Sequence, residues 1–72
     1  MLENKSALEL TGLAHSGASF EIDGLRYAAL ELIGIAHALS PGAHMKIYHS
    51  SARPTLELNS IAQAAPGRVT FT

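Results

Sequence analysis

The sequence predicts an α/β repeat protein in which three parallel strands form one sheet, in the order 1-2-3, and three helices cover one face of it. The predicted fold therefore has two layers, a sheet and a layer of helices. The first observation is an eight-residue phrase that occurs three times, at 8–15, 30–37 and 56–63. A short alternation of apolar and polar residues, typical of a half-buried strand, follows each copy. An evenly spaced glycine separates helix from strand in each repeat: Gly17, Gly42 and Gly67.

Length and composition restrict the class of protein. The 72 residues predict one domain, 1–72, with a core of marginal size. The chain is 47% hydrophobic and 15% charged with a net charge of −1, which predicts neither disorder nor binding to nucleic acid. It contains no cysteine, which fits the cytoplasm. No apolar run reaches the roughly 18 residues of a membrane span, and the acidic start does not resemble a signal peptide, so we expect no membrane association.

The first repeat predicts a helix over about residues 5–15 and a strand over about 18–22. Ser6 and Glu9 have the spacing of a capping box, which satisfies free amides at the start of a helix. Apolar residues then recur at helical spacing, and Gly17 suits the left-handed stop.

The second repeat predicts a helix over about 23–40, with Asp23 as its N-cap, and a strand over about 43–48. Asp23 and Gly24 could also form a hairpin turn, but the residues after them follow helical spacing. This helix is apolar over more of its surface than the other two, as expected for a middle repeat with neighbours on both sides. A proline and a glycine end it.

The third repeat predicts a helix over about 54–65 and a strand over about 68–72. Pro54 suits the first turn of a helix, because its missing amide would have no partner there. The apolar positions of this strand lie one residue nearer to the glycine than in the other repeats, which a one-residue difference in the loop explains.

The connections decide the arrangement of these elements. Strands joined through a helix run parallel, and nearly all such crossovers are right-handed, which places all the helices on one face. A doubly wound fold is excluded, because its strands read as continuous apolar runs and these alternate.

The other face of the sheet is therefore predicted to be open and polar. It is a candidate surface for another protein or a partner subunit, and the alternative is a solvated face whose charge pairs contribute little. Its candidate residues are Glu21, His44, Lys46, Tyr48, Arg68 and Thr70.

A candidate ligand site is predicted at the carboxyl ends of the strands, where open α/β sheets bind ligands. The start of the third helix could hold a small anion there, although serines before a helix commonly serve as caps. A serine, a histidine and an aspartate are present, but neighbours in an extended segment point apart and no nucleophile elbow follows, so catalysis is not expected. The candidate residues are Asp23, Tyr27, His49, Ser50, Ser51 and Arg53.

Two histidines are weighed as metal ligands. His15 and His37 occupy the same position of the phrase, where Gln63 stands in the third copy. Zinc takes three or four ligands, and equivalent positions on adjacent helices lie about 8–10 Å apart. A polar residue near the helix C-terminus is the preferred interpretation, and we expect no metal and no cofactor.

The sequence thus predicts a small cytoplasmic protein whose role is association, with itself as a homodimer and with another protein. Open sheet edges and helix layers are both surfaces on which a second copy could bind. The alternative is a small-molecule or anion binder, with minor enzymatic activity, that uses the strand ends around residues 49–53.

Overall fold

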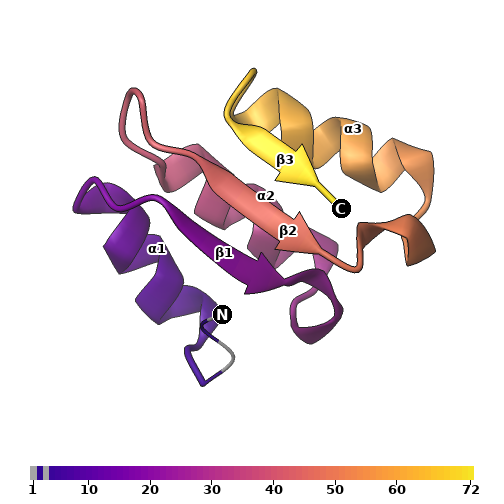
Figure 1. Cartoon of the computed structure of the whole chain (residues 1–72), viewed down its shortest axis with the longest axis horizontal. Coiled ribbons are helices and arrows are strands. Elements are labelled where there is room, and N and C mark those ends of the chain that lie inside the picture. Colours follow the sequence, from indigo (N-terminus) through magenta and orange to yellow (C-terminus); the bar gives the residue numbers. More distant parts are fainter. Residues whose placement is uncertain (1, 3) are drawn as a thin grey trace.

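The computed structural model describes residues 2 and 4–72 and confirms the predicted fold class. Helices and strands alternate along the chain, and Figure 1 looks onto the sheet with the helices behind it. None of the helices in this described part is long and apolar enough to cross a membrane. The elements are α1 (Ala7–His15), β1 (Phe20–Asp23), η1 (Gly24–Arg26), α2 (Ala29–Ala38), β2 (Met45–Tyr48), η2 (Ser50–Ala52), α3 (Thr55–Ala64) and β3 (Val69–Phe71).

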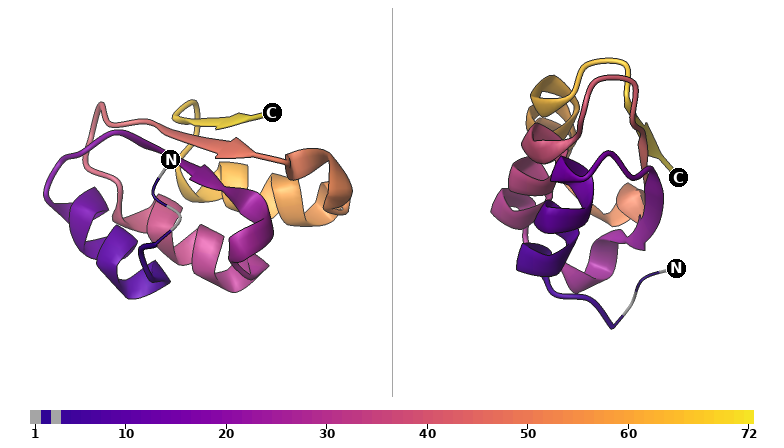
Figure 2. Two further views of the ribbon diagram at one scale, coloured as in Figure 1. Left: turned by 60° about the horizontal axis from the view of Figure 1, so that its bottom comes forward. Right: turned by 90° about the vertical axis from the view of Figure 1, so that its left-hand side faces the viewer.

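The sheet has the predicted order, β1-β2-β3, and both pairs of strands are parallel. Phe20 stands beside Met45, and Met45 stands beside Val69, so one register runs across the sheet. Both views of Figure 2 show the helices on one side of the sheet. The molecule therefore has two layers, and the second face of the sheet is the open one.

The core lies between these layers and uses the residues whose spacing predicted it. Leu10 and Leu32 from the helices meet Ile22 and Ile47 from the strands, and all four are fully buried. Polar strand residues alternate with these and face the open side, as the period of a strand requires.

The start of α1 confirms the predicted capping box. The Ser6 hydroxyl accepts a hydrogen bond from the Glu9 amide at 3.1 Å, and the Glu9 carboxylate accepts one from the Ser6 amide at 2.9 Å. In the next repeat the Glu31 carboxylate accepts from the Ala28 amide at 2.9 Å, although Ala28 has no capping side chain. The glutamate of the phrase therefore holds the start of two helices.

The predicted start of the second helix is wrong by several residues, because α2 begins at Ala29. Asp23 does cap a helix, but it is the short 3-10 helix η1: its carboxylate accepts from the Leu25 amide at 2.9 Å. The chain is extended at Tyr27 and Ala28 before α2 starts. It uses η1 to pass from the sheet layer to the helix layer, and Leu25 is left exposed.

The glycine of η1 lies directly against the end of β2. A Cβ at Gly24 would stand 2.7 Å from Cγ2 of Ile47 and 2.8 Å from the carbonyl oxygen of Tyr48. Real Cβ atoms do not approach other atoms so closely, and one of these two is backbone. Gly24 therefore permits η1 to pack on the end of β2.

Gly24→Ala should lower the free energy of unfolding by about 1–3 kcal/mol, because the new methyl group overfills this contact. Gly34→Ala is the matched control, since a Cβ at Gly34 in α2 meets nothing within 4 Å. Alanine also favours a helix interior over glycine, so the control should gain about 0.5–1 kcal/mol. Urea unfolding measures both, and equal stability of the two variants would contradict the close approach at Gly24.

Candidate functional site

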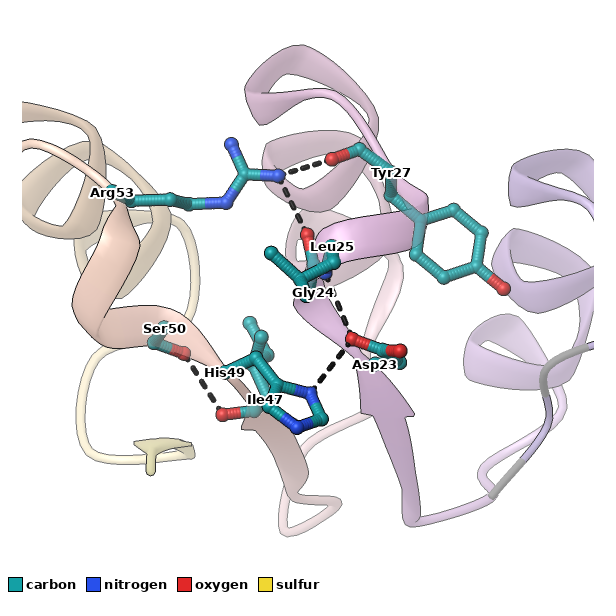
Figure 3. Close-up of polar contacts among 8 residues, drawn as sticks. All are labelled: Asp23, Gly24, Leu25, Tyr27, Ile47, His49, Ser50 and Arg53. Atoms are coloured by element: carbon teal, nitrogen blue, oxygen red, sulfur yellow. Dashed lines mark hydrogen bonds and ion pairs between the residues drawn. The ribbon is translucent and has the colours of Figure 1, made fainter.

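The structure brings together part of the predicted strand-end site, which we call the strand-end cluster: Asp23, His49, Ser50 and Arg53 (Figure 3). Nδ1 of His49 lies 3.0 Å from Oδ1 of Asp23, and this oxygen also accepts from the Leu25 amide at 2.9 Å. His49 has a left-handed backbone with φ 61°, which turns the chain from β2 into η2. The Leu25 amide, and after it His49, hold the pKa of the Asp23 carboxyl below its usual value.

Arg53 crosses from the third repeat to the second. Its guanidinium donates to the carbonyl of Gly24 at 2.7 Å, to the carbonyl of Tyr27, and to the carboxylate of Glu57 at 3.1 Å. The side chain is only 16% exposed. Its charge is therefore directed at internal acceptors, and it joins two repeats through their backbone.

Ser50 is buried, and its hydroxyl donates to the carbonyl of Ile47 at 2.9 Å. Its amide donates to the carbonyl of Thr72 at 2.9 Å. The hydroxyl is thus used to hold the end of β2, and Figure 3 shows it directed at Ile47. Ser51, the next residue, is exposed.

Tyr27 is buried, and its side chain points away from the strand-end cluster (Figure 3). Its hydroxyl donates to the carbonyl of Lys5 at 2.7 Å, just before α1. Tyr27 therefore connects the second repeat to the first, as Arg53 connects the third repeat to the second.

Four of the six residues predicted for the open sheet face lie on its strands, and His44 directly precedes β2. The Tyr48 hydroxyl donates to the Glu21 carboxylate at 2.8 Å, and the Lys46 ammonium stands 5.1 Å from the centre of the Tyr48 ring. A shallow hollow of about 220 Å³ lies beside this group, and His44 and Thr70 line it. The open face is polar: the Tyr48–Glu21 hydrogen bond joins β2 to β1, and Lys46 contacts Tyr48 on its own strand.

The side chain of Arg68 is turned towards the helix layer. Its guanidinium donates to the carbonyl of Ser40 at 2.7 Å and to that of Leu39 at 3.4 Å, at the end of α2. It precedes the first residue of β3, where the chain still follows the loop.

No group of three histidine, cysteine, aspartate or glutamate residues is placed to hold a metal ion among residues 2 and 4–72. His15 and His37 are both exposed in the last turns of their helices, the location predicted for polar residues near a helix C-terminus.

A surface that the sequence analysis missed lies on the outer side of the helix layer. We call it the leucine row: Leu8, Leu30 and Leu56, which are 81%, 82% and 79% exposed. The repeated phrase carried the signal. Two leucines stand two residues apart in each copy, and positions i and i+2 of a helix face different ways, so only one of them reaches the core.

Arg53→Met should lower the free energy of unfolding by about 1–3 kcal/mol, because it leaves the carbonyls of Gly24 and Tyr27 without their donor in a half-buried place. Arg26→Met is the matched control. Arg26 is exposed on η1, so its loss should change stability by less than about 0.5 kcal/mol. Urea unfolding compares the two, and similar effects would show that Arg53 does not join the repeats.

Asp23 should titrate below the usual range of aspartate in the folded chain. The unfolded carboxyl binds its proton more readily, so the stability that Asp23 contributes is complete above its ordinary pKa and is lost as pH falls through the folded value. Carbon-detected NMR titration measures this pKa. His49→Ala should raise the pKa only part of the way, because the Leu25 amide, the larger cause, remains. An ordinary pKa in the unchanged chain would refute the assignment.

Comparison with protein-family models, with curated proteins and with solved structures finds no match to this chain. Its function is therefore inferred from its own contacts, burial and charge.

Proposed function

We propose that this chain is a self-association module whose copies bind one another and present a surface to other proteins. The observation that carries the proposal is the pair of free edges of its sheet. Among the described residues β2 pairs on both sides, whereas β1 and β3 each pair on one side only. Free edges offer a row of unsatisfied amides and carbonyls to another strand.

The edge at β3 shows which groups are on offer. The Met45 amide donates to the carbonyl of Arg68, and the Thr72 amide donates to the carbonyl of Ile47. In a parallel strand alternate residues bond to opposite sides. The amides and carbonyls of Val69 and Phe71 therefore point away from β2.

The side chains at this edge support the same proposal. Val69 and Phe71 pack against the core but are only half-buried. A domain of this length buries only about 60% of the surface that its unfolded chain exposes, so a partner that covers these side chains would add apolar burial that the single chain lacks.

The leucine row supports association with a different protein as well. Three large apolar side chains at one level of three parallel helices form a regular surface, and exposed apolar patches commonly mark interaction sites. The polar open face lies on the other side of the molecule. One side of the assembled sheet and one side of its helix layer thus stay available.

The alternative of a small-molecule or anion binder has less support. In the strand-end cluster the Arg53 guanidinium bonds to backbone carbonyls, and the Ser50 hydroxyl is buried against Ile47. Neither group is left to hold a ligand.

We propose that the module works in the cytoplasm. A chain without cysteine forms no disulfide, so it does not need an oxidising environment.

Size-exclusion chromatography with light scattering at micromolar concentration should give a mass above that of one chain. The mass should fall on dilution, because free edges bind a partner reversibly. A single-chain mass across the whole concentration range would refute self-association.

A further inference from the structure

A directional series of hydrogen bonds runs through the stacked repeats. Lys5, Tyr27 and Arg53 each stand two residues before the first residue of a helix. The Tyr27 hydroxyl donates to the carbonyl of Lys5 at 2.7 Å, and the Arg53 guanidinium donates to the carbonyl of Tyr27. The second and the third repeat therefore each donate to the backbone of the repeat before them. The next donor in this series is the Lys5 ammonium, and the next acceptor is the carbonyl of Arg53.

In the part of the chain that the structure describes, the outer side of the first repeat lacks the neighbouring repeat that the corresponding side of the other two has. Leu13, Ile35 and Ile61 occupy the same position of the repeated phrase. Ile35 and Ile61 are fully buried, in the repeats that follow another, whereas Leu13 is half-buried. Leu13 lines a hollow of about 410 Å³ beside α1, together with Lys5 and Ser16.

The outer side of the third repeat shows the complementary defect. Leu10, Leu32 and Leu58 also occupy one position of the phrase. Leu10 and Leu32 are fully buried, in the repeats that precede another, whereas Leu58 is half-buried. Leu58 lines a hollow of about 190 Å³ with Phe71. Among residues 2 and 4–72 no repeat packs on the outer side of the first repeat or of the third.

The edge strands match in register. Phe20 pairs with Met45 and Met45 with Val69, so continuing the register places Val69 beside Phe20 of a second copy. The Phe20 amide donates to the carbonyl of His44, just before β2, which directs the backbone of Ser19 and Glu21 to the free edge. The outward amide and carbonyl of Val69 would therefore meet outward groups of these two residues.

We propose that copies of this chain stack head to tail, with β3 and α3 of one copy against β1 and α1 of the next. The inference rests on the proposed self-association and names its partner and its geometry. The contact repeats the packing of α1 on α2 and of α2 on α3 inside the chain. Leu58 of one copy covers Leu13 of the next, and the Lys5 ammonium donates to the carbonyl of Arg53. Such an interface is heterologous, so it builds a ring or a filament in place of a two-fold dimer.

Two variants block one end each. Ser16→Arg acts at the first repeat: Ser16 is exposed, whereas Ala38, at the same position of the second repeat, is buried. Leu58→Arg acts at the third repeat. Every head-to-tail contact needs one end of each kind, so each variant alone should be a single chain in light scattering. An equal mixture should regain one contact and run at twice the mass of one chain, because each variant supplies the end that the other lacks.

His15→Arg and Leu56→Arg are the matched controls. They place the same side chain close to the tested position in each of the two repeats, at positions that are exposed in all three repeats. Both should keep the oligomer of the unchanged chain. Circular dichroism and urea unfolding should show all four variants folded, since each substituted side chain has room at the surface.

The outcomes separate the two proposals. An oligomer that survives Ser16→Arg and Leu58→Arg, or a mixture that stays at the mass of one chain, overturns the head-to-tail arrangement while self-association stands. Loss of the oligomer in Leu56→Arg also overturns the head-to-tail arrangement, because it shows that the copies bind through the leucine row. An unchanged chain that is monomeric overturns self-association itself, and the arrangement with it.

Discussion

The structure depends on hydrogen bonds that side chains of one repeat donate to the backbone of the repeat before it. Where the chain passes between the sheet and the helix layer, its carbonyls lie outside regular ladders, and a buried carbonyl without a donor costs free energy. At the strand ends Tyr27 and Arg53 supply these donors. At the helix ends Ser40 donates to Ala14, and Arg68 donates to Ser40. At the strand ends and at the helix ends alike, the donor thus belongs to the later repeat and the acceptor to the earlier one.

The regular part of this fold could be predicted because it repeats three times. The change of period from helix to strand and the stop glycines specify alternating elements, and the alternation within the strands assigns the covered face. The start of α2 could not be predicted in the same way. Leu25 has the apolar spacing of that helix and so suggests an earlier start. In the structure the Leu25 amide bonds to the Asp23 carboxylate within the 3-10 helix η1, and α2 begins only at Ala29.

The strand-end cluster shows a different limit. Parallel topology alone brings Asp23 and His49 to the same edge of the sheet, and they lie in contact there. What Arg53 and Ser50 bond to depends on which backbone carbonyls the loops leave free. These hydrogen-bond partners are set by the folded loops and cannot be predicted from the residue types. Residue types suggested a ligand site, and the loops use the same groups to close the fold.

A repeat stack that ends in solution needs polar side chains where its internal repeats are apolar. Thr11 and Asn59 follow this rule, because they stand where the middle repeat has Ile33, but other positions of the end repeats do not. Leu13 and Leu58 keep the residue type of their buried equivalents, and Lys5 keeps a donor at the position from which Tyr27 and Arg53 bond backwards. At these positions the end repeats therefore carry the chemistry of an internal repeat, which is the basis of the proposed head-to-tail contact.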